Sequence, residues 1–284
     1  MGMNLLNKTA AIAAMAVLVT GPIHAEEDAK LTINDGELTI QTSAPASSYQ
    51  EGLDEVTSGW VYRTKETQAL QMDDFDNPSF VFIDKALDLF SEVDGTEGKS
   101  CAACHASPEE FAGLTATMPR INSDGELETT IDLINECRVD RMGAEAWKYS
   151  GPQMSSMAAL VGLQSRGMPV NVAVDGAAAP FWKKGKELYN TRAGQLDMSC
   201  ANCHQDNFDT MIRADHLSQG QINGFPTYRL KNAKMNTVQG RFKGCMKNIR
   251  AQPYAEGSDE FNALELYVAS RGNGLTVETP SVRN

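Results

Sequence analysis

Two short stretches decide the fold of this chain: Cys101-Ala102-Ala103-Cys104-His105 and Cys200-Ala201-Asn202-Cys203-His204. Each is a C-x-x-C-H motif, the spacing typical of covalent haem c attachment, in which two thiols add to the vinyl groups and the adjacent histidine supplies one axial nitrogen. A zinc site would place its histidine several residues away, and a thioredoxin-type C-x-x-C needs no histidine after it. We therefore expect two covalently bound haem c groups. Their attachment residues would be Cys101, Cys104, Cys200 and Cys203, with His105 and His204 as iron ligands.

The residues around the two motifs repeat. When the motifs are superposed, 99 residues apart, four pairs align: Phe82 with Phe181, Ala86 with Gly185, Leu89 with Leu188 and Phe90 with Tyr189. Their i, i+4, i+7, i+8 spacing predicts an amphipathic helix before each motif, with a small residue where another helix could cross closely. Residues 157–167 and 262–272 both end in Ser-Arg-Gly and predict a second helix closing each half.

A start helix, a haem motif, a loop and an end helix together form the layout of a small cytochrome c domain. We therefore predict a mainly α protein with two tandem cytochrome c-like domains, residues 77–178 and residues 179–284. Residues 26–76 would form an N-terminal extension packed on the first domain, with a weak hairpin signal at 31–40 around Asn34-Asp35-Gly36. Residues 42–48 and 170–180 have the composition of linkers.

The first 25 residues have the pattern of a cleaved secretion signal. Lys8 precedes an apolar run at 9–20, and Ala25 is followed by three acids. The run is too short to anchor the chain in a bilayer, so we expect export to the periplasm without a membrane anchor. With 37 acids against 25 Lys and Arg, the net charge of −12 argues against nucleic acid as a partner.

Each iron needs a second axial ligand, and two kinds of residue compete for that position. Only His216 remains beyond the motifs and residues 1–25, so two bis-histidine haems are excluded. Met118 and Met168 are candidates, as are the two leftover cysteines, Cys137 and Cys245, which lie at comparable places in the two halves. The cysteines could provide one thiolate ligand in each half, or they could form a disulfide between the halves.

The surroundings of Cys245 are unusually basic. No acid occurs in residues 216–255, which contain seven cations: Arg229, Lys231, Lys234, Arg241, Lys243, Lys247 and Arg250. Arg241 lies four residues before Cys245, so on a helix the two would share a face. The stretch is either a solvated docking face or an anion site, because cations near a sulfur favour its thiolate and attract a small dianion.

Together these residues resemble the SoxA family, the larger subunits of the SoxAX cytochromes of thiosulfate oxidation, in their dihaem form. The resemblance extends from about residue 59 to residue 276. It rests on both haem motifs and on residues 66–71, 73–78, 217–220, 223–226, 228–230, 241–245, 250–254 and 263–267.

The resemblance implies a site and a reaction. His105 and Cys137 would ligate the first haem, and His204 and Cys245 the second, active-site haem in residues 179–284. Cys245 would carry an extra sulfur as a persulfide, Arg241 would act with it in catalysis, and Lys243 has no assigned role.

The implied enzyme is an L-cysteine S-thiosulfotransferase. It joins thiosulfate oxidatively to a cysteine of the carrier SoxY, paired with SoxZ, and passes electrons through haem to SoxX and on to a soluble cytochrome c. The alternative is a periplasmic dihaem electron carrier without sulfur chemistry.

Overall fold

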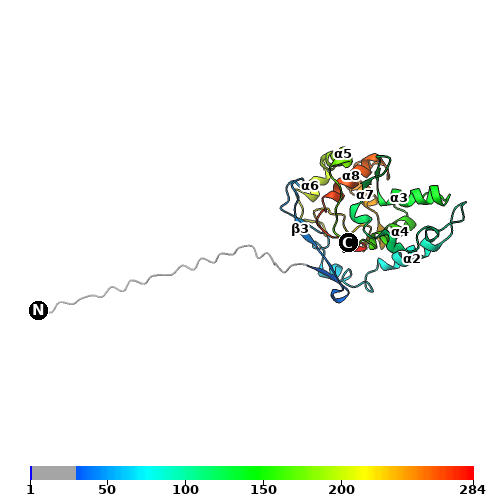
Figure 1. The fold of residues 1–284 in the computed structure, drawn as a ribbon. Helices are drawn as coiled ribbons and strands as arrows, with labels where there is room; N and C mark the ends of the chain where they lie inside the picture. Colours follow the sequence, from blue (N-terminus) through cyan, green and yellow to red (C-terminus); the bar gives the residue numbers. More distant parts are fainter. Residues whose placement is uncertain (2–29) are drawn as a thin grey trace.

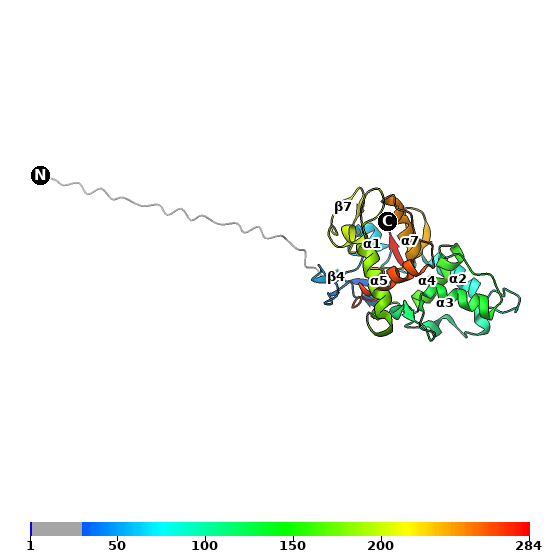
Figure 2. The ribbon, with the colours of Figure 1, turned by 90° about the horizontal axis from the view of Figure 1, so that it is seen from above.

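The computed structural model describes Met1 and residues 30–284, so the expected signal peptide lies outside the described residues apart from Met1. Two helix pairs organise the chain, and Figures 1 and 2 show them in neighbouring parts of the molecule. In the first half α2 (Phe80–Ser91) packs on α4 (Pro152–Leu163), and in the second α5 (Ala179–Asn190) packs on α8 (Asp259–Ser270). The predicted start and end helices of both halves are therefore confirmed.

The small residues of the start helices set how closely each pair packs. A Cβ on Gly185 would lie 2.0 Å from the carbonyl oxygen of Ala263 on α8, so only glycine fits this crossing. Ala86, in the equivalent position on α2, is fully buried in a cluster with Phe90 and Leu160. The close helix crossing expected from the repeat is thus present, and it is tighter in the second half.

Shorter elements connect these helices. The other helices are α1 (Lys65–Ala69), α3 (Thr130–Glu136), α6 (Cys200–His204) and α7 (Val238–Asn248). The strands form small antiparallel pairs: β1 (Leu31–Ile33) with β2 (Leu38–Ile40), β3 (Ser43–Pro45) with β4 (Glu55–Thr57), β5 (Arg120–Ile121) with β6 (Leu127–Glu128), and β7 (Met211–Ile212) with β8 (Asp215–His216). In the three-stranded sheet, β9 (Thr227–Arg229) lies between antiparallel β10 (Lys234–Asn236) and parallel β11 (Ser281–Arg283). Within residues 30–284, no helix has the length and apolarity needed to cross a membrane.

The N-terminal extension differs from its predicted arrangement. The hairpin signal is confirmed, because β1 and β2 pair with Leu31 opposite Ile40. The linker assignment at 42–48 is wrong, since this stretch contains β3 and pairs with β4. The extension was predicted to pack on the first domain, but it contacts both halves. Asp74 pairs with Arg166 of the first half at 2.6 Å, whereas Gln50 and Ser58 bond to the second half, at the carbonyl of Arg271 and at Glu278.

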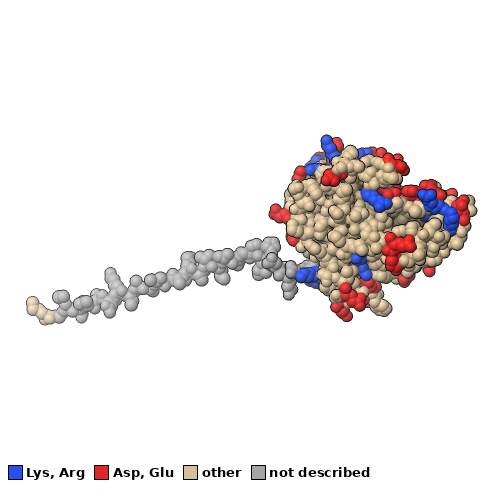
Figure 3. Space-filling model, viewed as in Figure 1, with Lys and Arg blue, Asp and Glu red and all other residues tan. Residues whose placement is uncertain are grey.

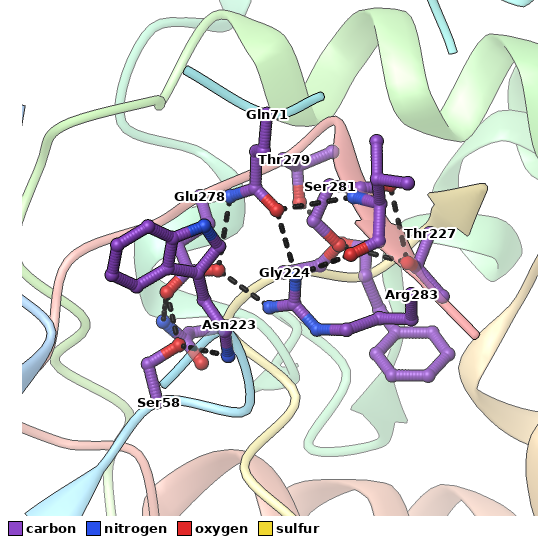
Figure 4. A network of polar contacts seen from close by, with 12 residues as sticks. Ser58, Gln71, Asn223, Gly224, Thr227, Glu278, Thr279, Ser281 and Arg283 are labelled. Carbon is purple, nitrogen blue, oxygen red and sulfur yellow. Dashed lines mark hydrogen bonds and ion pairs between the residues drawn. The ribbon is translucent and has the colours of Figure 1, made fainter. Parts of the chain in front are cut away.

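A buried polar network fixes the end of the chain to this extension (Figure 4). The fully buried carboxylate of Glu278 accepts hydrogen bonds from Ser58, from Gln71 at 3.3 Å and from Asn223 at 3.3 Å, and it pairs with Arg283 at 2.6 Å. Through these bonds to one carboxylate, the network joins the extension, the loop at Asn223 and β11 into one unit.

The second predicted linker, residues 170–180, is also integrated into the fold. Val170 and Val172 are buried, and the amide of Val170 donates to the carbonyl of Leu275 at 2.8 Å. The linker assignment is therefore wrong here as well. Its Ala, Gly and Val content reflects close packing against the C-terminal tail, and α5 already begins at Ala179.

Candidate haem and sulfur site

The second haem motif forms α6, a short helix with a defined start. The Ser199 hydroxyl caps it by accepting a hydrogen bond from the backbone amide of Asn202. In return, Asn202 Oδ1 accepts a hydrogen bond from the backbone amide of Ser199 at 3.0 Å. This reciprocal cap starts the helix at Cys200. Cys200 and Cys203 are three residues apart on it and so share one face, as attachment to a single haem requires.

His204 is oriented by a bond from its other ring nitrogen. Its Nδ1 lies 2.8 Å from the carbonyl oxygen of Ser218, which leaves Nε2 available for iron. Burial lowers the pKa of His204, and this favours the neutral imidazole that binds metal. Gly220 has φ of +80°, and a Cβ there would lie 2.8 Å from the ring, so glycine lets the loop pass beneath the histidine.

The first haem motif has looser support. Cys101 begins a single 3-10 turn, Cys101–Ala103, and Cys104 follows directly after it. The Nδ1 atom of His105 faces Glu110 Oε2 at 3.3 Å, and the ring packs on Phe111 with 4.7 Å between ring centroids. Here too Nε2 is the nitrogen left for a metal. Both motifs thus place two thiols and one oriented imidazole together, a donor set that fits haem c.

The two leftover cysteines are separated between the halves. None of the six cysteines forms a disulfide in the structure, so the alternative of a Cys137–Cys245 disulfide finds no support. Burial raises the pKa of Cys137, with Glu136 and Cys104 adding to the effect. Burial likewise raises the pKa of Cys203, and Cys245 adds to it. Each leftover cysteine therefore lies within electrostatic range of the haem motif of its own half.

The competing methionines occupy other surroundings. Met118 is buried and lines a cavity together with Ile131 and Glu265. Met168 is 37% exposed. His216 bonds to Asp209 at 2.9 Å on the short β7–β8 hairpin.

Arg241 and Cys245 lie one turn apart on α7, as predicted from their spacing. Within residues 30–284, the Arg241 guanidinium forms no ion pair and no hydrogen bond. Arg229 lies within electrostatic range of both: burial lowers its pKa, Arg241 adds to this, and Cys245 opposes it. Its Nε donates to the carbonyl of Asn284 at 2.9 Å, which fixes the side chain.

A third arginine reaches this region from the N-terminal extension. The side chain of Arg63 is only 7% exposed, and its Nε is buried without a hydrogen-bond partner among the described residues. Burial lowers its pKa, and the charges of Arg283 and Arg241 act in the same direction. Sequence reasoning missed Arg63, because no local pattern connects it with a cysteine 182 residues later.

The other cations of the basic stretch have different partners. Lys243, whose role was open, pairs with Glu256 at 2.8 Å, and Glu256 accepts from Ser150 of the first half. Arg250 bonds to Gln195 at 3.3 Å. On the face drawn in Figure 3, acidic and basic side chains are scattered between large uncharged areas. The basic stretch is therefore divided between the surroundings of Cys245 and structural pairs.

Comparisons with known proteins agree with this geometry. The family model described as SoxA/TsdA, cytochrome c domain, matches residues 85–170 and 184–277. The chain is 55% identical over 265 residues to the L-cysteine S-thiosulfotransferase subunit SoxA of Rhodovulum sulfidophilum, covering 92% of both chains. It is 51% identical over 281 residues to that of Paracoccus pantotrophus, covering 97% of both.

A solved structure shares the fold. The crystal structure of SoxXA from P. pantotrophus superposes with a TM-score of 0.87 at 52% identity, covering 90% of this chain and 97% of that chain. The residues that the family model matches contain both C-x-x-C-H motifs. The chain therefore belongs to the SoxA/TsdA family of cytochrome c domains and, within that family, to the SoxA proteins.

Proposed function

We propose that this chain joins thiosulfate to a cysteine of the SoxYZ carrier with Cys245 and Arg241 as its catalytic residues. Membership of the SoxA proteins makes it an L-cysteine S-thiosulfotransferase subunit with covalently bound haem c. One observation carries the assignment of residues. An arginine without an ion-pair partner among residues 30–284 lies one helical turn from a cysteine that forms no disulfide, and a second arginine, Arg229, lies within electrostatic range of both.

The reaction requires an anion site and an electron acceptor. Joining the sulfane sulfur of thiosulfate to a carrier thiol forms one S–S bond and releases two electrons and the thiol proton. Haem held at Cys200, Cys203 and His204 would supply a one-electron acceptor for them. The planar fork of Arg241 suits the sulfonate oxygens of thiosulfate, to which it can donate two charge-assisted hydrogen bonds. The Cys245 sulfur could form the S–S bond to the sulfane sulfur first, and the two electrons would be released at that step. Attack by the carrier thiolate would then break this bond, form the S–S bond of the conjugate and restore the Cys245 sulfur without further oxidation.

Two haems, each held by a histidine and a cysteine of its own half, complete the proposal. Cys101 and Cys104 would attach the first haem, with His105 and Cys137 on iron. Cys200 and Cys203 would attach the second, with His204 and Cys245 on iron. Two low-spin His/thiolate signals in the electron paramagnetic resonance spectrum of the oxidised protein would support this. A His/Met or high-spin signal would contradict it for the haem concerned.

The proposed partners follow from the relatives' names. The solved relative is a SoxXA complex, so SoxX is the expected partner subunit, passing electrons to a soluble cytochrome c. The same proposal includes the domain limits 77–178 and 179–284, cleavage after residue 25 and location in the periplasm. An electron carrier without sulfur chemistry fits less well, because it has no use for the free Arg241 beside Cys245.

The mass of Cys245 tests the covalent role. We expect the peptide containing Cys245 to carry the mass of one additional sulfur in native protein and to lose it after treatment with mild reductant or cyanide. The Cys137 peptide of the same sample is the matched control and should not change. If the Cys245 peptide carries no additional sulfur, and Cys245→Met keeps full conjugation activity, the proposed covalent role is wrong.

A further inference from the structure

Arg271, at the C-terminal end of α8, is a buried cation without a counter-charge among residues 30–284. Its side chain is among the largest that are fully buried, with 1% of the residue exposed. All three guanidinium nitrogens lack a hydrogen-bond partner among the described residues, and none of the ion pairs in that part of the chain includes Arg271. A guanidinium remains protonated in proteins, and burying it without a partner is strongly unfavourable. The site therefore requires an anion.

The equivalent arginine of the first half has the counter-charge that Arg271 lacks among the described residues. Arg166 occupies the same place in the Ser-Arg-Gly sequence that ends the first half. It pairs with both carboxylate oxygens of Asp74, at 2.6 and 2.7 Å. The second half has kept the arginine at this place without an acid to pair with it.

Arg271 faces the surroundings of the second haem motif. Its guanidinium lies 4.8 Å from the centre of the Tyr189 ring, and Tyr189 packs in one cluster with Ala201 and Cys200. Burial raises the pKa of Cys200, and the charge of Arg271 opposes this; burial lowers the pKa of His204, and the charge of Arg271 adds to it. The cation therefore lies within electrostatic range of both a haem attachment residue and a haem ligand.

A second donor accompanies it. The Tyr189 hydroxyl is also buried and without a partner among the described residues. Burial raises the pKa of Tyr189, so the phenol remains neutral and cannot neutralise Arg271. A charged fork and a neutral O–H next to each other are the donors that a carboxylate binds best.

We propose that Arg271, with Tyr189 as a second donor, binds a propionate carboxylate of the haem attached at Cys200 and Cys203. This rests on the proposed second haem, which brings two carboxylates into the site where its thioether bonds fix it. Thiosulfate is a poorer match, since a substrate must enter and leave, whereas Arg271 is enclosed and Arg241 is partly open. In the first half Asp74 already neutralises the arginine, so the first haem would lack this contact.

Resonance Raman spectra of the haem-loaded complex with its partner subunit test the assignment through the propionate bending bands. We expect Arg271→Leu to shift a band of the second haem and to lower that haem's reduction potential, because a positive charge near the iron favours its reduced form. Arg271→Lys, which keeps the charge, should shift the band but leave the potential closer to wild type. Tyr189→Phe should shift the band alone.

Arg166→Lys is the matched control and should change neither property of the second haem. Haem content separates this inference from the proposed function. One haem per chain would contradict the dihaem assignment itself. With two haems present and His/thiolate signals intact, unchanged bands in Arg271→Lys and Tyr189→Phe would overturn only the propionate contact. A structure of the loaded protein with water or thiosulfate on Arg271 would overturn it equally.

Discussion

Leu133 lies four residues before Cys137 in the first half, whereas Arg241 lies four residues before Cys245 in the second. The halves differ in the same way elsewhere. Aligned on their Ser-Arg-Gly ends, Leu160 of α4 corresponds to Glu265 of α8. Both halves keep the helix pair and the haem motif, but at these two positions the second half has an ionisable residue where the first has leucine. The scaffold is duplicated, and the chemistry is concentrated in one copy.

The largest effect should come from removing Arg241, the charge that lies four residues before Cys245 and has no counterpart before Cys137. We expect Arg241→Ala to lower thiosulfate conjugation to SoxYZ about a hundredfold, on the order of 3 kcal/mol, with both haems retained. The mass of the carrier after reaction measures the conjugate. Arg213→Ala, which removes an exposed cation near the β7–β8 turn, is the control and should have little effect. Turnover of Arg241→Ala within twofold of wild type would show that this arginine does not bind substrate.

The tight crossing in the second half should be less tolerant of change than its counterpart. Gly185→Ala places a methyl group against the backbone of α8, so we expect a loss of about 2–3 kcal/mol in the free energy of unfolding. Ala86→Gly, the reverse change in α2, should cost only about 1 kcal/mol, mainly through helix propensity. Urea unfolding of the haem-loaded variants compares them, and equal losses would mean that the two crossings are equivalent.

Glu265 should make stability depend on pH in a way that Leu160 cannot. Burial raises the pKa of Glu265 to about 7, with Asp132 adding and Gln239 opposing. Between pH 4.5, its ordinary pKa, and about 7, the folded protein keeps a proton that the unfolded chain has released. Stability should therefore fall as pH rises across this window, by roughly 1–3 kcal/mol.

Replacing the carboxyl separates this contribution from others. Glu265→Gln should remove most of the decline in unfolding free energy between pH 5 and pH 7.5. Glu260→Gln on the same helix is the control, because backbone bonding and Lys184 lower the pKa of Glu260. A decline that persists in Glu265→Gln would assign it to another group, such as Asp132, whose pKa burial also raises.

The smallest effect concerns the paired arginine of the first half. Arg166 and Asp74 are largely shielded from solvent and bidentate, so a double-mutant cycle with alanine at both positions should give a coupling of about 1 kcal/mol. The haem potentials should stay unchanged, in contrast to Arg271→Leu. A coupling near zero would mean that the pair is a surface contact, and its value as a reference for Arg271 would be lost.

Local patterns in the sequence determined much of this protein. Contiguous residues predicted the haem motifs, the four helices of the repeat and the first hairpin. Each of these features depends on the spacing of residue types along the chain. The one-turn relation of Arg241 to Cys245 was predictable for the same reason.

Only the tertiary structure decided which distant residues meet these motifs. Arg63 of the extension lies within electrostatic range of Arg241. Ser58 and Gln71 donate hydrogen bonds to Glu278 in the C-terminal tail. Lys243 pairs with Glu256. The predicted linkers failed similarly, because small residues indicate flexibility only when nothing packs on them. The unpaired state of Arg271 could not be foreseen either. Its sequence context equals that of Arg166, and the difference lies in whether an acid almost a hundred residues away reaches it.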